Sequence, residues 1–293
     1  MMEADTMNCT VCGEMLKKGL QDWHFVCSNC GYEKSVLEPT INEEKSHEHI
    51  DESARRSGLA NLRKANFKRL VHLLKTLRPA PGGHLLDVGS AHGWFLEEAA
   101  AHFKVLGIEP DQGVYDKSKA NGHPQRVGYF PEALKESEVF DVIVFNDVIE
   151  HIPPISKILE ACHKNLKEGG LLLLNIPSSK GIFYRLSRIF IRLGIKSPFD
   201  RMWQKGLPSP HVHYFNEDNL RELAEHMGFR ERLRGTLPSL STHGLLTRIS
   251  YASTWPEALN YALWVVLLIL TPIINVLPKD TIFIIFERKD IEP

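Results

Sequence analysis

The chain has 293 residues, of which 43% are hydrophobic, and its 35 basic and 36 acidic side chains give a formal net charge of -1. This length and composition are sufficient for one sizeable core with an additional module, and they exclude wholesale disorder. The balanced charge also excludes the basic imbalance typical of nucleic-acid binders, so we do not expect nucleic acid as a partner.

The N-terminus, MMEADTMNCTVCGEM, has no basic start followed by an apolar run, so it does not resemble a secretory signal. We therefore expect a cytoplasmic protein, in which thiols stay reduced or bind metal.

Four of the five cysteines form two C-x2-C pairs, Cys9 with Cys12 and Cys27 with Cys30, and fourteen residues separate the pairs. A glycine follows each pair, as a tight turn that presents two thiolates would need. Two such pairs supply four ligands to a tetrahedral Zn²⁺ and leave no open position for water. The pattern predicts a structural zinc ribbon at residues 1–38; a redox pair is the alternative, although that usually occurs as a single motif.

Residues 39–82 are predicted to form a linker and N-terminal helices. A polar run from Glu38 to Glu52 precedes apolar residues at helical spacing from Ser53 to Leu77. We interpret the basic residues on the other side of this helix as a solvated face. Pro79 and Pro81 end the helix.

From residue 83 the pattern alternates between apolar strands and helices. Strands are predicted at 84–89, 104–111, 140–147 and 170–177, with helices at 94–103, 113–122 and 155–166. Such alternation is typical of an α/β fold with a parallel sheet covered on both faces, whose ligands bind at the carboxyl ends of the strands. Cys162 occupies an apolar helical position and is expected in the core.

The turn after the first strand reads Asp87-Val-Gly89-Ser-Ala91-His-Gly93, which is neither the G-x-G-x-x-G motif nor a P-loop with its lysine. An acidic residue at this turn is unsuitable for a pyrophosphate but suits a cationic aminoacyl group. Glu109 ends the second strand, 22 residues after Asp87, where a carboxylate would accept hydrogen bonds from ribose hydroxyls. A ribose next to a positive charge, without pyrophosphate, indicates S-adenosylmethionine.

The stretches LLDVGSAHGWFLEEA, LGIEPD, FDVIVFNDVIEHIP and LKEGGLLLLNIPS resemble the successive motifs of class I S-adenosylmethionine-dependent methyltransferases. HVHYFNEDNLRELAEHMGF and DTIFIIFERK resemble the continuation found near the ubiquinone-biosynthesis O-methyltransferases. The resemblance implies a Rossmann-like, mostly parallel seven-stranded sheet with an antiparallel last strand. The methyltransferase domain would span 83–238, with a cap or acceptor insertion at 181–215 and the last strand and tail at 280–293.

The resemblance also implies roles for individual residues. In this cofactor-binding set, Gly89, Ala91 and Gly93 would let the backbone approach the methionine part, and Asp87 would orient the turn. Glu109 would bind the ribose and Phe130 would cover the adenine. Asn146 would lie beside the sulfonium. The family usually has glycine at the position of Ala91, but alanine is small enough to preserve close approach.

Methyl transfer requires in-line positioning and removal of the acceptor's proton. The run Asp147-x-x-Glu150-His151 lies at a strand end, and His151 is the candidate base. In the resembled enzymes this run can hold a divalent metal such as Mg²⁺; the alternative is that Glu150 and His151 only begin the next helix. His211 and His213 are the further catalytic candidates, with acceptor binding and structural hydrogen bonding both open.

Two segments are typical of proteins that bind to a membrane surface. Residues 181–196 place apolar side chains on one helical side and Arg185, Arg188 and Arg192 on another, as in a cationic amphipathic helix. Within an apolar insertion at 239–279, the twenty residues 258–277 carry no charge. Because the flanking strands should join one sheet, we expect a re-entrant or in-plane helical hairpin broken at Pro272 rather than a single crossing. A buried hairpin or a homodimer interface is the alternative.

Together these patterns predict a methyltransferase that acts on a hydroxyl of a small or lipid-linked amphiphilic acceptor, at the inner face of the membrane. Two alternatives remain: an RNA methyltransferase that grips rRNA or tRNA with its ribbon, and a non-catalytic cofactor-binding protein whose ribbon docks a partner. Methylation of base nitrogens generally uses an N-P-P-Y or D-P-P-Y turn, whereas this chain has Asn-Asp-Val-Ile at 146–149.

Overall fold

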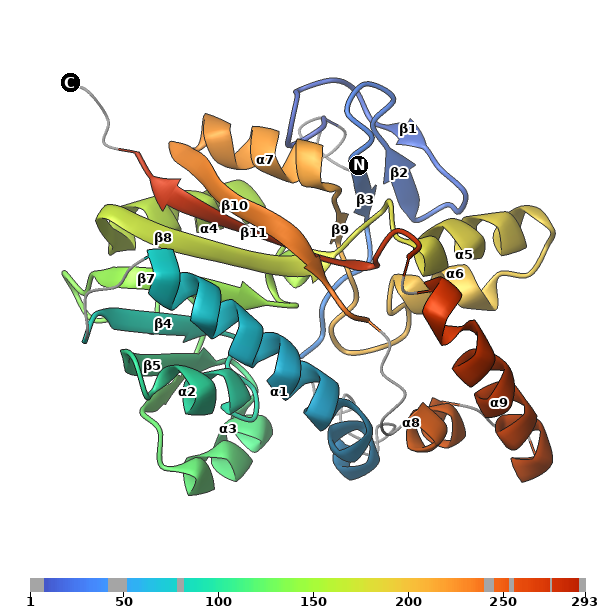
Figure 1. The fold of residues 1–293 in the computed structure, drawn as a ribbon. Coiled ribbons are helices and arrows are strands. Elements are labelled where there is room, and N and C mark those ends of the chain that lie inside the picture. The colour runs from blue at the N-terminus through green and yellow to red at the C-terminus, as the bar shows by residue number, and fades with distance from the viewer. Residues whose placement is uncertain are drawn as a thin grey trace.

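The computed structural model describes residues 8–41, 52–77, 82–239, 245–252, 256–274 and 276–289. Within these ranges a seven-stranded sheet has the order β10-β11-β8-β7-β4-β5-β6 (Figure 1). Its strands, in chain order, are β4 (His84–Val88), β5 (Lys104–Glu109), β6 (Gln125–Val127), β7 (Phe140–Asn146), β8 (Leu166–Pro177), β10 (Phe229–Leu237) and β11 (Thr281–Arg288).

The sheet confirms the predicted fold class. β4, β5, β6, β7 and β8 pair in parallel, whereas β11 lies antiparallel between β8 and β10. Successive side chains of a strand point to opposite faces, and in β7 the residues from Val142 to Phe145 are all buried. Burial on both sides explains why these strands read as continuous apolar runs.

Helices cover the two faces of the sheet. α1 (Glu52–Leu77) and α2 (Trp94–Ala99) pack on one face, whereas α4 (Ile155–Asn165) and α7 (Glu217–His226) pack on the other. A further helix, α3 (Gln112–Ser118), follows β5. Cys162 on α4 is fully buried, which confirms its predicted place in the core.

The N-terminal module is joined to the sheet domain by backbone pairing. β1 (Lys17–Lys18), β2 (His24–Val26) and β3 (Glu33–Ser35) form an antiparallel sheet whose fourth strand, β9 (His213–Tyr214), comes from the C-terminal half of the chain (Figure 1). The predicted glycine turns are present, since Gly13 and Gly31 have φ of 77° and 72°. The apolar side chains of the module continue into the core of the sheet domain.

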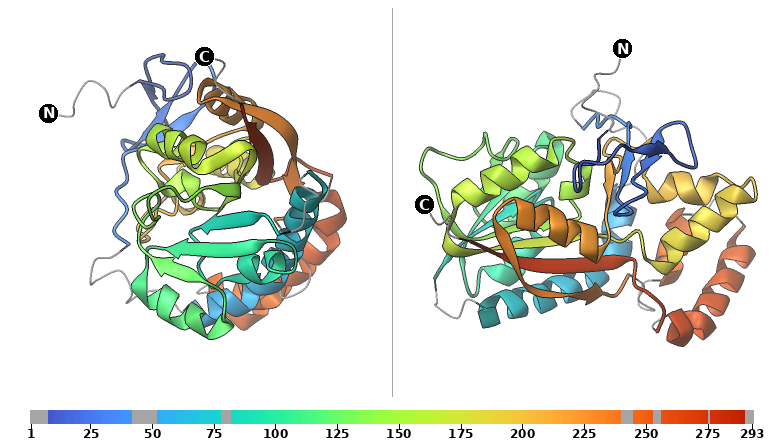
Figure 2. Two further views of the ribbon diagram at one scale, coloured as in Figure 1. Left: turned by 90° about the vertical axis from the view of Figure 1, so that its left-hand side faces the viewer. Right: turned by 90° about the horizontal axis from the view of Figure 1, so that it is seen from above.

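Four helices lie at the end of the sheet where the parallel strands terminate: α5 (Ile182–Arg192), α6 (Ser197–Met202), α8 (Leu245–Ala252) and α9 (Glu257–Ile274) (Figures 1 and 2). The predicted break at Pro272 is wrong, because α9 continues to Ile274. A proline lacks the N–H that would bond the carbonyl four residues earlier, and α9 continues for only two residues beyond it. In the described part of the chain, no helix is both long and apolar enough to cross a membrane.

Some predictions fall on residues outside the described ranges. These are most of the charged run at 42–51, the proline break at 78–81, and residues 240–244, 253–255 and 275 of the apolar insertion.

Candidate cofactor and acceptor site

A cavity of about 710 Å³ opens at the carboxyl ends of β4, β5 and β7, where the sequence predicts the ligand. Seven predicted residues line it: Gly89, Ala91, Glu109, Phe130, Asn146, Asp147 and His151. The volume lies within the ordinary range for sites that bind small molecules. Asp87, Gly93, Glu150, His211 and His213 lie around the cavity rather than in its lining.

The turn after β4 has left-handed backbone at alternate residues. Gly89, Ala91 and Gly93 have φ of 71°, 43° and 72°. A Cβ on Gly89 would lie 2.5 Å from a methyl carbon of Val148, so glycine is required there both for conformation and for space. Ala91 adopts a conformation that costs an L-residue roughly 1 kcal/mol, which explains why the resembled family favours glycine at this position.

Glu109 is held in place by the same turn. Its carboxylate accepts hydrogen bonds from the backbone N–H groups of Ala91 (2.8 Å) and Asp111 (2.9 Å), and burial raises its pKa. Asp87 lies beneath the turn with 2% of its surface exposed. Burial, together with the charge of Glu109, raises the pKa of Asp87 to about 8, against a weak bond of 3.4 Å from the Asn146 amide. Two buried carboxyls favour a ligand that offers hydroxyl donors and a positive charge.

The carboxyl end of β7 is strained and is tied to neighbouring elements. Asp147 has a φ of 54°, and its N–H donates to the Asn175 carbonyl at 2.8 Å. Its carboxylate accepts a hydrogen bond from Arg63 on α1 at 3.1 Å. Arg63 belongs to the helix face predicted to be solvated, but it lines the cavity. Its place here depends on how α1 packs, which helical periodicity does not show.

His151 ends a 3₁₀ turn at Ile149–His151 and is fixed by its backbone neighbours. Its Nδ1 donates to the Pro210 carbonyl at 2.9 Å, so in the neutral ring the lone pair lies on Nε2. That nitrogen is 3.9 Å from Glu150. The geometry therefore presents a basic nitrogen at the wall of the cavity.

Glu150 and His211 form a second layer behind His151. Within the described residues, neither Glu150 carboxylate oxygen has a hydrogen-bond partner, nor does the Nδ1 of His211. Burial and the charge of Asp147 raise the pKa of Glu150 well above its usual range, and burial lowers the pKa of His211. One ligand atom from each of Glu150, His151 and His211 lies within 4.8 Å of the others, while Asp147 does not belong to this cluster.

His213 lies deeper, between the N-terminal module and the cavity wall. Its Nε2 donates to the Ile152 carbonyl at 3.0 Å, and its Nδ1 accepts a hydrogen bond from the Tyr32 hydroxyl. Burial lowers the pKa of His213 to about 4, so the ring is neutral. These contacts are structural hydrogen bonds, one of the two roles left open by the sequence.

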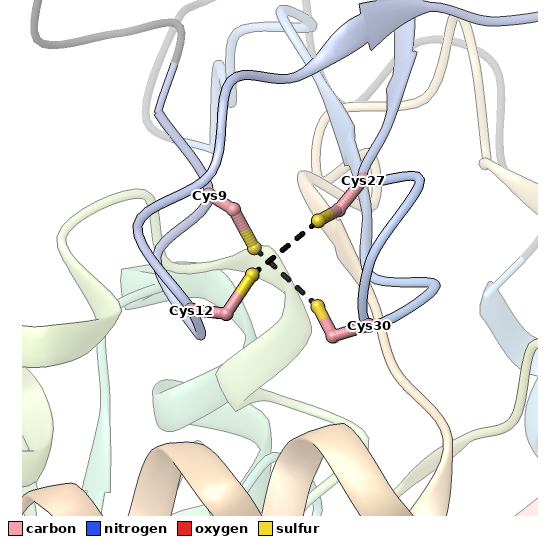
Figure 3. A group of neighbouring side chains, drawn as sticks. All are labelled: Cys9, Cys12, Cys27 and Cys30. Carbon is pink, nitrogen blue, oxygen red and sulfur yellow. Dashed lines mark hydrogen bonds between the residues drawn. The ribbon is translucent and has the colours of Figure 1, made fainter.

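The four N-terminal cysteine thiols converge on one point (Figure 3). The Sγ atoms of Cys9 and Cys30 are 3.5 Å apart, as are those of Cys12 and Cys27, and all four lie within 4.8 Å of one another. Tetrahedral Zn–S bonds of about 2.3 Å would separate the sulfurs by about 3.8 Å. The arrangement therefore fits a four-thiolate zinc ribbon.

Several lining residues were not predicted as site residues. Besides Arg63 they include Pro39 and Ile41, from the stretch predicted to be a linker, and Gln204, Leu207 and Pro208, from the cap. A proline-rich run with scattered apolar residues carries no ligand-specific signal, so only the packing of these segments identifies them.

Comparison with known proteins places this geometry in context. A sequence model of the family described as "Methyltransferase domain" matches residues 59–232. The ubiquinone biosynthesis O-methyltransferase of Paramagnetospirillum magneticum is 36% identical over 105 residues, covering 33% of this chain and 41% of the relative. The mitochondrial enzyme of that name from Mus musculus is 28% identical over 158 residues, covering 48% and 42%. The chain thus spans less than half the length of these relatives.

Solved structures agree on the fold. A SAM-dependent methyltransferase from Thermotoga maritima superposes with a TM-score of 0.52 at 16% identity, covering 83% of this chain and 96% of that chain. The magnesium protoporphyrin IX methyltransferase of Synechocystis with bound SAH gives 0.52 at 11% identity, covering 80% and 87%. At these identities the likeness concerns the fold alone.

Proposed function

We propose, from the premise that this chain belongs to the methyltransferase-domain family matched over residues 59–232, that it transfers the methyl group of S-adenosylmethionine to a hydroxyl. The acceptor would be a small or lipid-linked amphiphile. One observation carries the proposal: a single cavity joins Glu109, suited to a ribose, to His151, suited to accept a proton. The two relatives described above are O-methyltransferases, which agrees with a hydroxyl as acceptor.

The cofactor would occupy the part of the cavity between β4 and β5. Glu109 has its carboxylate pre-oriented by two backbone N–H groups and would accept hydrogen bonds from the ribose hydroxyls. Gly89 and Ala91 would let the backbone approach the methionine part, and Phe130, which also lines the cavity, would cover the adenine. The buried carboxyl of Asp87 would hold the cationic amino group by a hydrogen bond, and the positive charge of that group would favour the ionised form of the carboxyl.

The acceptor would occupy the other part, between the 3₁₀ turn and the cap. Its lining is mainly apolar, from Ile152, Pro153, Ile158, Leu207 and Pro208, with polar side chains from Arg63, Asp147, His151, Gln204 and Ser209. Apolar walls with a few convergent polar groups suit a ring or chain compound that bears a hydroxyl. This polarity is the reason for preferring an amphiphile over a sugar or a polynucleotide.

S-adenosylmethionine supplies an electrophilic methyl group on a sulfonium. The acceptor oxygen forms a bond to the methyl carbon as the carbon–sulfur bond breaks, with its electron pair going to sulfur. His151 Nε2 takes the proton from the hydroxyl, and the Pro210 carbonyl stabilises the resulting imidazolium through Nδ1–H.

A divalent metal is the alternative to a plain base. Glu150, His151 and His211 are the residues that would hold it, and the unpartnered Glu150 carboxylate fits such an ion. Two imidazoles with one carboxylate favour a transition metal over Mg²⁺. When bound, the ion would lower the pKa of the acceptor hydroxyl.

The ribbon would hold a structural Zn²⁺ through Cys9, Cys12, Cys27 and Cys30. Four thiolates leave no position for substrate, so this ion would take no part in the transfer. Elemental analysis of the purified chain is expected to give one zinc per chain, and a metal-free folded chain would contradict the proposal.

The acceptor class is tested by transfer of a labelled methyl group from S-adenosylmethionine into separated cell fractions, with Glu109→Gln as control. We expect the parent protein to transfer label into the lipid fraction and the variant to transfer none. Label in RNA would replace the proposal with the nucleic-acid alternative. Cofactor binding without label in any fraction would favour a non-catalytic binding protein.

An amphiphilic acceptor is consistent with peripheral attachment to a membrane. α5 packs inward through Tyr184, Ser187 and Ile191, while Leu186, Ile189 and Phe190 face solvent. Exposed apolar side chains lie on α5 and just after it (Leu186, Ile189, Phe190 and Leu193) and on α9 (Leu259, Tyr261, Val265, Val266, Ile269 and Leu270). We refer to these two surfaces together as the apolar outer face. Arg185 and Arg192 border this face, as expected for contact with anionic lipid. Location at the inner face of the membrane is thus part of the proposal.

We expect the chain to co-sediment with vesicles containing anionic lipid, and the paired change Ile189→Asp with Ile269→Asp to abolish this. Both side chains are half exposed or more, so folding should persist. Met15→Asp, at an exposed apolar residue of the ribbon, is the matched control. If the paired change instead turns a dimer into a monomer without affecting vesicle binding, the apolar outer face is a homodimer interface.

A further inference from the structure

The cavity wall on the acceptor side is built from three layers of backbone. We propose that the N-terminal ribbon is a positioning element for this wall, in which Tyr32 and His213 hold the segment that carries His151. The ribbon would thereby control how the acceptor is placed, while the cofactor subsite is held independently. The effect on catalysis rests on the proposed function; the mechanical link does not.

The first link is continuous backbone hydrogen bonding. Val212 stands between two segments: its N–H donates to the Glu150 carbonyl at 2.9 Å, and its carbonyl accepts from the Ser35 N–H at 3.0 Å. The Ser35 hydroxyl also donates to the His211 carbonyl at 2.7 Å. The residue before His151 is therefore two hydrogen bonds away from strand β3 of the ribbon.

The second link runs through side chains. The Tyr32 hydroxyl donates to Nδ1 of His213, whose Nε2 donates to the carbonyl of Ile152, the residue after His151. Tyr32 and His213 are buried, and Tyr32 lies two residues after the ligand Cys30. A neutral imidazole has one donor and one acceptor nitrogen, so the tyrosine hydroxyl fixes the tautomer that can hold Ile152. His151 is thus held in position by hydrogen bonds to the residues before and after it.

The third link is the chain that leaves the ribbon. Pro39 and Ile41 line the cavity themselves, and between them the Thr40 N–H donates to the Pro208 carbonyl at 2.7 Å. Pro208 also lines the cavity and lies two residues before Pro210, whose carbonyl orients the His151 ring. Through this segment the ribbon would position both His151, the proposed base, and the cap that encloses the acceptor.

The cofactor subsite is organised differently. Glu109 is fixed by the N–H groups of Ala91 and Asp111, and the backbone of Gly89 and Ser90 donates to the Ile108 carbonyl. All of these bonds lie within the β4–β5 region. Disturbing the ribbon should therefore impair the acceptor subsite and leave the cofactor subsite intact, whereas a general loss of stability would impair both.

The test combines Tyr32→Phe with a matched control, Tyr184→Phe. Tyr184 is also a buried tyrosine bonded to the ribbon, but its hydroxyl donates to Glu33, on the side away from His213. For Tyr32→Phe we expect zinc content and SAH affinity within twofold of the parent, with kcat/KM for the acceptor reduced about tenfold because positioning is lost. Tyr184→Phe should leave kcat/KM within twofold.

Hydrogen–deuterium exchange gives a readout that does not depend on activity. In Tyr32→Phe, and in the parent after zinc removal by a chelator, amides of 148–154 and 208–216 should exchange faster, while those of 87–93 should not. Equal acceleration in all three segments, or no acceleration, would overturn the proposal. If Tyr32→Phe does not fold, Ser35→Ala removes the bond of the Ser35 hydroxyl to the His211 carbonyl, along with the longer bond that it accepts from the Leu37 N–H at 3.3 Å, and should give the same pattern with smaller amplitude. If the exchange pattern is as expected but the parent shows no methyltransferase activity, the proposed function is refuted and the mechanical link between ribbon and wall is not.

Discussion

Replacing His151 with asparagine is expected to lower kcat by about 100-fold or more, with SAH affinity unchanged, because a positioned general base contributes roughly 10²–10⁴ in rate. An asparagine amide can still donate to the Pro210 carbonyl, as Nδ1 of His151 does at 2.9 Å, so the turn should keep its shape. What disappears is the basic nitrogen at the cavity wall. Steady-state rates for the acceptor, with calorimetry of SAH binding, measure the two effects separately.

His163→Asn is the matched control for this substitution. His163 lies on α4 and contacts the Lys289 carbonyl at 3.2 Å, away from the cavity, so its replacement should leave kcat within twofold. A His151→Asn protein that keeps normal turnover would exclude His151 as the base. If turnover of the parent falls on treatment with a chelator and is restored by a transition metal, while the ribbon keeps its zinc, His151 acts instead as a ligand with Glu150 and His211.

Replacing Glu109 with glutamine is expected to weaken binding of S-adenosylmethionine and of SAH about 30- to 100-fold. A hydrogen bond to a charged acceptor contributes about 1.5–3 kcal/mol, and each 1.4 kcal/mol corresponds to a factor of ten in affinity. Glutamine is isosteric, but one of its two acceptor oxygens becomes a donor. That group would then face either the Ala91 or the Asp111 N–H, both of which now donate to the carboxylate.

The matched control is Glu132→Gln, which changes an exposed carboxylate in the lining of the same cavity. It should leave the affinity within twofold, because no hydrogen bond joins Glu132 to the turn within the part of the chain that the structure describes. Calorimetric titration with SAH measures both variants. Equal losses in the two variants would mean that cavity charge, rather than a specific ribose contact, determines affinity, and the assignment of Glu109 would fail.

The cofactor half of the site could be predicted from the sequence because its determinants are local. Gly89 and Glu109 lie at the ends of adjacent strands, so apolar periodicity together with one acidic residue places them at the same edge of the sheet. Even the departure at Ala91 has a local meaning, since its φ of 43° is a property of that one turn. The same applies to the ribbon, where the spacing of Cys9, Cys12, Cys27 and Cys30 is enough to predict convergence.

The acceptor half could not be predicted in this way. Arg63 is one of several basic residues on α1, and only the packing of that helix brings it to Asp147. Pro39 and Ile41 lie in a stretch with no ligand-specific pattern, and His213 shows its role only once Tyr32 is beside it. Each of these contacts joins residues at least 80 positions apart in the chain, which no local pattern encodes.

The sequence by itself therefore determined the alternating strands and helices of the sheet domain, the tight turn after β4 and the thiol cluster, because each depends on residues close together or on a periodic pattern of burial. Only the tertiary structure decided that the ribbon shares a sheet with β9, that α9 continues past Pro272 and that α5 turns apolar side chains outward. These features depend on which surfaces meet, and hydrophobic burial is non-directional, so composition alone does not select the partner of an apolar face.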